Sequence, residues 1–312
     1  KASEMNKMKT KHDHFVAPYD DSVSFDELPD APPRSKFRFS LTGWIGLIIV
    51  SFWVIIAITG PFIAPYGEND LPFPDAYSEF QVPQPGAWLG TDVTDRDILS
   101  RLIYGAGRTI GIAFLATTLA YVLGVVLGIG AAISNPKIDM VISRINDAIL
   151  SLPTIMLGLV VVAAIGSSIP VLICTAGVIY ASVVFRLARA LGQEIMVMDF
   201  VEAARVRGEG LWWIITKEIW PNAAMSLMTD FGLRLIYVIL FVSSLSFLGL
   251  GVQPPQADWG SMVRENLGAL QYGTSIIPVI APAIAIATLT VGINLIVDDV
   301  SAFSGGKLSK RL

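Results

Sequence analysis

Six long apolar stretches constrain the fold of this 312-residue chain more than any other feature of its sequence. A helix needs about twenty apolar residues to cross the hydrocarbon core of a bilayer, and it satisfies its own backbone hydrogen bonds there. The stretches all suit such a crossing, at 42–64, 108–133, 141–165, 169–190, 223–249 and 275–298. The sequence therefore predicts an all-α membrane protein with six transmembrane helices.

The amino-acid composition supports the same class. Hydrophobic residues make up 53% of the chain and charged residues only 15%, whereas soluble domains carry about 25% charged residues. The formal net charge of −4 offers no basic surface to a nucleic acid, so no such partner is expected. The single cysteine, Cys174, excludes an intrachain disulfide.

The second apolar stretch carries a small residue at every fourth position. This spacing places the small residues near one helical face and permits close helix contact in lipid. The residues are Ala116, Ala120, Gly124 and Gly128. We expect another transmembrane helix to pack against this face.

Lysine and arginine gather on alternate sides of the predicted helices. Seven precede the first helix, five lie at the end of the fourth helix and on the segment between it and the fifth, and three follow the sixth. The segment after the fifth helix has only Arg264, and the segment after the first has three arginines, counting Arg108 at the start of the second helix, against seven carboxylates. Because cytoplasmic loops carry the excess of positive charge, both termini and the segment between helices four and five are expected to be cytoplasmic.

This cytoplasmic segment has residues that typically begin and end helices, and they predict two short helices around a glycine turn. Asp199 is a candidate N-cap, with Glu202 three residues later to bond back to it. Gly208 and Gly210 give the backbone the freedom to end the first helix and turn the chain. Pro221 is expected to close the second helix. A rigid helix–turn–helix outside the membrane predicts mechanical coupling to another protein rather than chemistry.

Four separated motifs carry a resemblance to a known family. Glu202-Ala203-Ala204, followed by Gly208 and then Ile219-Trp220-Pro221, resembles the EAA loop of membrane subunits of ATP-binding-cassette (ABC) importers. Three further motifs resemble the C-type permease of dipeptide, oligopeptide and nickel importers. They are Leu89-Gly90-Thr91-Asp92 with Arg96-Asp97 and 99–106; 247–255 with Trp259-Gly260 and Met262; and Asp139, Arg144 and Asp147 with Pro153. The match covers about residues 40–300, although Asp95 stands where the family usually has glycine.

The resemblance implies a type I ABC importer permease fold and a pore-forming subunit of an ATP-driven importer in the bacterial inner membrane. It also implies a coupling loop that docks on a cytoplasmic ATPase. The residues of that loop are Glu202, Ala203, Ala204, Gly208, Glu209, Ile219 and Pro221. The implied partners are a second homologous permease, two ATPases, an extracytoplasmic solute-binding protein and membrane lipid.

The resemblance also bears on chemistry and cargo. ATP and magnesium would bind to the ATPase partners, so this chain is expected to carry no cofactor and no metal and not to be an enzyme. Peptides are the implied cargo, with nickel chelates, opines or oligosaccharides as alternatives, because the solute-binding protein usually selects the cargo.

The expected organisation along the chain has five parts. A polar cytoplasmic tail at 1–40 precedes a first transmembrane helix at 41–65, and an extracytoplasmic loop at 66–106 includes an interfacial helix. A five-helix permease core at 107–300 contains the coupling loop at 191–222, and a cytoplasmic tail follows at 301–312.

Ionisable residues inside transmembrane helices are costly, and they suggest function. Asp230 and Arg234 lie four residues apart and can pair; they are either a structural ion pair or part of a substrate path. Arg144 and Asp147 are expected to form a structural pair near the cytoplasmic end of the third helix. Asp298 and Asp299 are expected to close the sixth helix.

Other function classes find less support. Gly305-Gly306-Lys307 lacks the first glycine and the preceding strand of a phosphate loop. His12 and His14, the two histidines, lie in the polar tail, where histidines are more often solvated than bound to a metal. Inverted repeats and ionisable residues deep in several helices would indicate a stand-alone secondary transporter or channel, and neither feature is evident. A membrane enzyme would need a histidine or nucleophile cluster near the membrane.

Overall fold

A computed structural model describes residues 39–308 apart from 76–77 and 274. The polar tail before residue 39, with His12 and His14, and residues 309–312 lie outside the described part. Within it the chain forms helices and connecting segments without a β-strand. The helices are α2 Leu41–Ile63, α3 Ile98–Ile133, α4 Pro136–Leu150, α5 Thr154–Ile165, α6 Ile169–Met196, α7 Asp199–Val206, α8 Leu211–Ile214, the π-helix η2 Ile215–Ile219, α9 Trp220–Phe247, α10 Trp259–Glu265, α11 Ala269–Tyr272 and α12 Ile277–Leu308.

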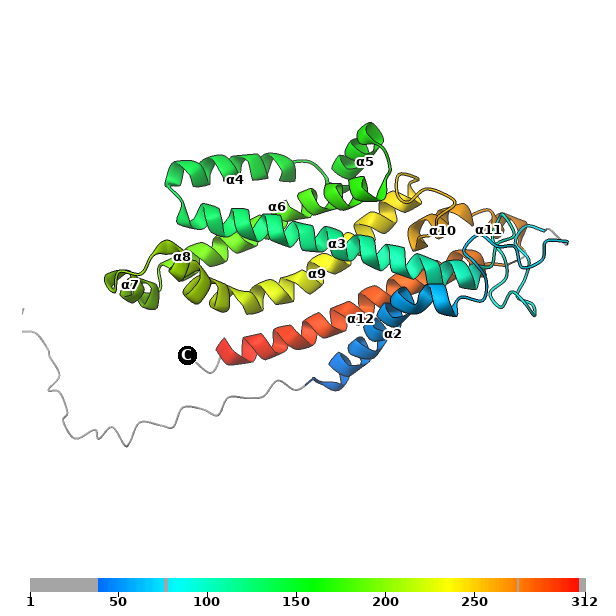
Figure 1. The fold of residues 1–312 in the computed structure, drawn as a ribbon, viewed down its shortest axis with the longest axis horizontal. Helices are drawn as coiled ribbons and strands as arrows, with labels where there is room; N and C mark the ends of the chain where they lie inside the picture. The colour runs from blue at the N-terminus through cyan, green and yellow to red at the C-terminus, as the bar shows by residue number, and fades with distance from the viewer. Residues whose placement is uncertain (1–38, 76–77, 274, 309–312) are drawn as a thin grey trace, which may run out of the picture. The chain divides into compact units, whose positions relative to one another are not determined.

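Five spans are long and apolar enough to cross a membrane in the described residues: α2, α3, α6, the continuous helix Leu211–Phe247, and α12. The pair α4 and α5 makes a sixth if it is counted as one span, and the two helices meet at 87°. Figure 1 shows α7 and α8 at one end of the bundle, the α7 end, and α10, α11 and the segment 66–97 at the other, the loop end. The expected all-α membrane architecture is confirmed.

The third predicted helix, 141–165, is wrong as a single straight element. The chain breaks at Ser151–Pro153, and α4 begins earlier, at Pro136. Pro153 has no backbone N–H to donate and disfavours helical geometry at the residue before it. Hydrophobicity continues through the break, so hydropathy alone does not reveal it.

The separate interfacial helix expected before the second transmembrane helix is also wrong. Residues 98–104 are the first turns of α3, which begins after Asp97, whose carboxylate accepts the Ser100 N–H at 2.7 Å. Ile98 and Leu102 are buried inside the protein rather than on a membrane surface. Packing against the chain's own core therefore takes the place of the expected interface with lipid.

The small-residue face of α3 packs closely on α6, as the four-residue spacing predicts. Ala116 and Ala120 are fully buried. A Cβ added to Gly124 would lie 2.6 Å from Val184 Cβ, and one added to Gly128 would lie 2.7 Å from the carbonyl oxygen of Phe185. Only glycine permits this approach of the two backbones.

Helix α12 does not end at Asp298 and Asp299 but continues to Leu308. The carboxylate of Asp299 accepts the backbone N–H of Ser40 at 3.2 Å, and Ser40 caps the start of α2. Asp298 accepts from the Asn294 side chain at 3.1 Å. Asp299 therefore links α12 to the start of α2, whereas Asp298 bonds within α12, and neither residue ends the helix.

Candidate functional site

The segment that resembles the EAA loop contains α7, whose start differs from the sequence prediction. Met198, not Asp199, occupies the N-cap position, and no side chain makes a capping bond. Asp199 and Glu202 instead lie in the first helical turn, where carboxylates interact favourably with the positive end of the helix dipole. The predicted capping box is therefore wrong by one residue, and the Glu202 side chain is exposed.

Gly208 ends α7. Its φ is +85°, in the left-handed region that favours glycine. The Gly208 N–H donates to the Arg205 carbonyl at 2.9 Å, and the Glu209 N–H donates to the Ala204 carbonyl at 3.1 Å. These two bonds form a Schellman motif, which satisfies the last carbonyls of the helix and sets the direction of the chain that follows.

The second helix of the segment does not stop at Pro221. Helix α8 passes through η2 into α9, and Pro221 lies in the first turn of α9. The Asn222 side-chain amide donates to the Glu218 carbonyl at 2.7 Å. We attribute the uninterrupted helix to the wider π-helical turn before Pro221, since such turns accommodate local disruption of the α-helical bonds.

A separate hydrophobic cluster, here called the α7-end core, ties this segment to the long helices. Val201 and Ala204 of α7, Ile214 of α8 and Ile219 of η2 are almost fully buried in it. The other buried members are Ile129 of α3, Ala188 and Ile195 of α6, and Ala223 and Leu227 of α9. Burial of a valine or isoleucine side chain is worth about 1.5–3 kcal/mol, so Val201, Ile214 and Ile219 hold this segment against the long helices.

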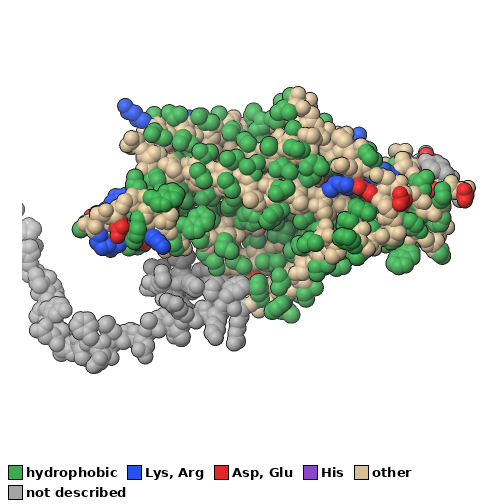
Figure 2. Space-filling view, in the orientation of Figure 1, with side chains coloured by type: hydrophobic (Ala, Val, Ile, Leu, Met, Phe, Trp, Pro, Cys, Tyr) green, Lys and Arg blue, Asp and Glu red, His purple; other side chains and the backbone are tan. Residues whose placement is uncertain are grey.

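The opposite face of α7 is open. Glu202 and Ala203 are exposed, Val206 keeps 85% of its surface accessible, and Trp212 of the adjoining α8 keeps 77%. Figure 2 shows acidic and basic side chains gathered over the α7 end, whereas the middle of this face is largely hydrophobic. A helix that is buried on one side and presents mixed apolar and charged residues on the other is suited to contact a second protein.

The intramembrane charges pair differently from expectation at one of two places. Arg234 Nη2 lies 2.9 Å from Asp230 Oδ1, so this predicted pair is present. Asp147, however, pairs with Arg186 of α6 at 2.8 Å, while Arg144 is exposed. The predicted Arg144–Asp147 pair is wrong, because Arg186 on the neighbouring helix α6 lies close enough to pair with Asp147.

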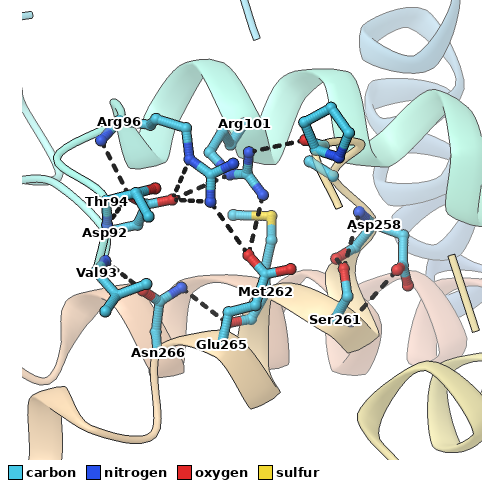
Figure 3. A network of polar contacts seen from close by, with 12 residues as sticks. Asp92, Val93, Thr94, Arg96, Arg101, Asp258, Ser261, Met262, Glu265 and Asn266 are labelled. Atoms are coloured by element: carbon cyan, nitrogen blue, oxygen red, sulfur yellow. Dashed lines mark hydrogen bonds and ion pairs between the residues drawn. The ribbon is translucent and has the colours of Figure 1, made fainter. Parts of the chain in front are cut away.

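A buried polar network lies at the loop end (Figure 3). Arg96 Nε donates to Asp92 Oδ2 at 2.8 Å, and Arg101 Nη2 donates to Glu265 Oε2 at 3.2 Å. Asn266 accepts the Val93 N–H at 3.3 Å. The network joins the segment before α3 and the first turn of α3 to α10 and its C-cap, Asn266. Arg101 Nη1 also donates to the Pro255 carbonyl at 3.2 Å, so two motifs that carry the family resemblance lie together in space.

The network contains a carboxylic acid with a perturbed pKa. Burial raises the pKa of Glu265, and the guanidinium groups of Arg101 and Arg96 oppose that rise. The sequence does not predict Glu265 as a partner, because the residue lies outside the recognised motifs. Its position three residues after Met262 is the only signal that could have pointed to it.

Asp95 adopts a conformation that explains its departure from the family pattern. Its φ is +61°, in the region where glycine is favoured. Gln81 Nε2 donates to its Oδ1 at 2.9 Å. Aspartate is one of the few residues other than glycine that adopt this backbone conformation, and the Asp95 N–H also donates to the Asp92 carbonyl at 3.1 Å.

Comparison with known proteins identifies the family. A profile described as "Binding-protein-dependent transport system inner membrane component" matches residues 120–302, which is more than half of the chain. This chain belongs to that family. A second profile, "N-terminal TM domain of oligopeptide transport permease C", matches residues 34–83 of this inner membrane component. The resemblance to C-type permeases is therefore confirmed, and the chain is a multi-pass inner membrane protein.

Individual relatives of this inner membrane component align over most of their length. It is 32% identical to the dipeptide transport system permease protein DppC of Alkalihalophilus pseudofirmus, with 86% of this chain and 92% of the relative covered. It is 30% identical to the peptide transport system permease protein SapC of an Escherichia coli strain, with 91% and 97% covered. The glutathione transport system permease protein GsiD of Pectobacterium atrosepticum is 29% identical, with 81% and 80% covered.

The fold also matches solved structures of transporters. A chain of the MetNI methionine ABC transporter in an inward-facing conformation superposes with a TM-score of 0.54 at 18% identity, covering 66% of this chain and 97% of that one. The fold class of an ABC importer permease is therefore confirmed.

Within the described residues, no group of three or more histidine, cysteine or acidic side chains is placed to hold a metal.

Proposed function

We propose that this inner membrane component is the pore-forming subunit of an ATP-driven importer of peptides. The relatives named above are dipeptide, peptide and glutathione permeases and align over most of this chain. The cargo assignment rests on them. The chain would supply one wall of the translocation path, and alternating access would come from movement of helix bundles around it.

The proposed assembly places four kinds of partner around the chain. A second homologous permease completes the path, two ATPase subunits bind ATP and magnesium at the cytoplasmic side, and a solute-binding protein delivers cargo from outside. The chain itself hydrolyses nothing. The distribution of lysine and arginine supports an orientation with both termini and α7 in the cytoplasm.

The two-sided packing of α7 carries the coupling proposal. Its inner face, Val201 and Ala204, belongs to the α7-end core together with side chains of α3, α6 and α9. Its outer face, including Glu202 and Ala203, is exposed. The proposed coupling loop of Glu202, Ala203, Ala204, Gly208, Glu209, Ile219 and Pro221 would dock on the ATPase and pass its movement through this core to the long helices.

A matched pair of glycine variants tests the coupling proposal. Valine at position 208 would have to adopt a φ near +85°, whereas Gly210 has a φ of −77° and no atom within 4 Å of an added Cβ. A β-branched residue in the left-handed region costs about 1–3 kcal/mol. Gly208→Val should therefore tilt or displace α7, while Gly210→Val should not.

The measurement is ATP hydrolysis and peptide uptake in the complete importer reconstituted in liposomes. We expect Gly208→Val to lower uptake per ATP hydrolysed, or to lose the ATPase from the complex, and Gly210→Val to behave like the parent. Normal uptake and assembly for both variants would remove the coupling role of this loop.

A further inference from the structure

The Asp230–Arg234 pair lies deep inside a membrane-spanning helix. The span runs from Leu211 to Phe247, and Arg234 lies twenty-three residues after its start and thirteen before its end, so about 20 Å of helix or more extends on either side at 1.5 Å per residue. A charge at that depth is costly unless it faces the interior of a bundle or an aqueous path. The position therefore requires a polar environment for the side of the pair that this chain leaves open.

Contacts within the chain use Asp230 fully and Arg234 only in part. Asp230 accepts from Arg234 Nε and Nη2 and from the Tyr121 hydroxyl at 2.6 Å. Among the described residues, none bonds to Arg234 Nη1, and 21% of the Arg234 side chain is accessible. The guanidinium thus keeps hydrogen-bond donors that no described residue uses.

Tyr237 extends this open donor set. The Arg234 guanidinium carbon lies 5.5 Å from the centre of the Tyr237 ring, and half of Tyr237 is exposed. Its backbone carbonyl accepts the Tyr180 hydroxyl at 3.1 Å, which links α9 to α6 there. The Tyr237 hydroxyl has no partner in the described part of the chain. Arg234 and Tyr237 therefore present neighbouring donors at mid-membrane depth.

We propose that Arg234 Nη1 and the Tyr237 hydroxyl bind the C-terminal carboxylate of a peptide as it crosses the membrane. This inference rests on the proposed importer function and names a contact point for its cargo. A guanidinium and a phenol both donate to carboxylate oxygens, and a C-terminal carboxylate is common to peptides of any sequence. A phospholipid is a poorer occupant, because its head group lies at the membrane surface and not at mid-depth.

The neutralising partner Asp230 suits this role. A lone arginine would hold a carboxylate strongly, whereas one already paired with aspartate holds it more weakly. Transport requires sites that favour binding enough to admit the cargo yet release it. Asp230 and Tyr121 would then position the guanidinium, and Arg234 and Tyr237 would touch the cargo.

The test compares a short peptide with its C-terminal amide in the complete importer, reconstituted with its own solute-binding protein. Uptake per ATP hydrolysed gives a carboxylate-to-amide ratio. Tyr237→Phe removes only a hydroxyl from an exposed ring. The double variant Asp230→Asn, Arg234→Gln removes both charges without leaving either unpaired. Tyr180→Phe is the matched control, because it also removes one hydroxyl, but one that bonds within the chain.

We expect the ratio to fall about tenfold in the double variant, the usual scale for a hydrogen bond to a charged group, and by a smaller factor in Tyr237→Phe. Tyr180→Phe should keep the parent ratio. An unchanged ratio in Tyr237→Phe and in an assembled double variant would overturn the proposal.

Two other outcomes are informative. If the double variant does not assemble, the pair serves subunit packing, and an unchanged ratio in Tyr237→Phe then overturns the proposed site. If the parent importer hydrolyses ATP but takes up neither form of any peptide, the proposed cargo class fails rather than this site alone.

Discussion

At the scale of single residues, side-chain chemistry was easier to predict than side-chain partners. The glycine at 208 was identified because its backbone freedom is a local property, and its φ of +85° agrees with that. The capping role of Asp199 was wrong by one position because Met198 takes the N-cap. The predicted partner of Asp147 is wrong, since Arg186, which pairs with it, comes from another helix.

Glu265 gives a prediction about pH. Burial raises the pKa of Glu265 in the folded chain above the ordinary value of 4.5. At pH values between 4.5 and this raised pKa, the folded chain binds more protons than the unfolded chain. The free energy of unfolding should therefore fall as pH rises through this interval. Glu265→Gln removes that contribution.

Thermal unfolding of parent and Glu265→Gln in detergent, at pH values from about 4.5 to 8, checks this expectation. Asp258, whose pKa burial also raises, is present in both proteins and cancels from the comparison. The melting temperature of the variant should improve relative to the parent as pH rises. Parallel melting curves at all pH values would show that Glu265 does not titrate differently in the folded state.

At the scale of helices, hydropathy located most elements and small-residue spacing located the closest contact. The face of Ala116, Ala120, Gly124 and Gly128 packs on α6 as predicted. The break between α4 and α5 was missed because the apolar run continues through it, although Pro153 was visible. Likewise, the first turns of α3 are buried by tertiary packing, which local amphipathicity cannot distinguish from an interface with lipid.

The contact between α3 and α6 gives a prediction about stability. A Cβ at Gly124 would lie 2.6 Å from Val184 Cβ and 2.8 Å from the Ala181 carbonyl oxygen, whereas one at Gly130 would meet no atom within 4 Å. Gly124→Val should cost about 1–3 kcal/mol from overpacking. Gly130→Val, in the same helix and with the same change of side chain, should cost clearly less. Thermal unfolding of the two variants in one detergent decides this, and equal losses would mean that the close packing is absent.

At the scale of the whole molecule, the membrane class and the family followed from the sequence, but the polar network at the loop end did not. Asp92, Arg96 and Arg101 are far from Glu265 along the chain, and only folding brings them together. The orientation in the membrane rests on charge distribution. A topology experiment can test it without knowledge of the cargo.

In a chain with Cys174 replaced by serine, a cysteine at Glu209 should react with a membrane-impermeant thiol reagent only from the cytoplasmic side. A cysteine at Gln256, in the exposed segment before α10, should react only from the outside. Labelling of both cysteines from one side would contradict the single membrane crossing between them. The reverse pattern would show that the chain has the opposite orientation in the membrane.

The central claim is that the outer face of α7 contacts an ATPase, and cross-linking from that face tests it most directly. A photoreactive group attached to Ala203→Cys, in the Cys174-free chain within the native complex, should capture an ATPase subunit, because Ala203 is exposed on α7. The same group at Gln256→Cys should capture none. Capture of the ATPase from position 256, or its absence at 203 in a complex that hydrolyses ATP, would contradict the account.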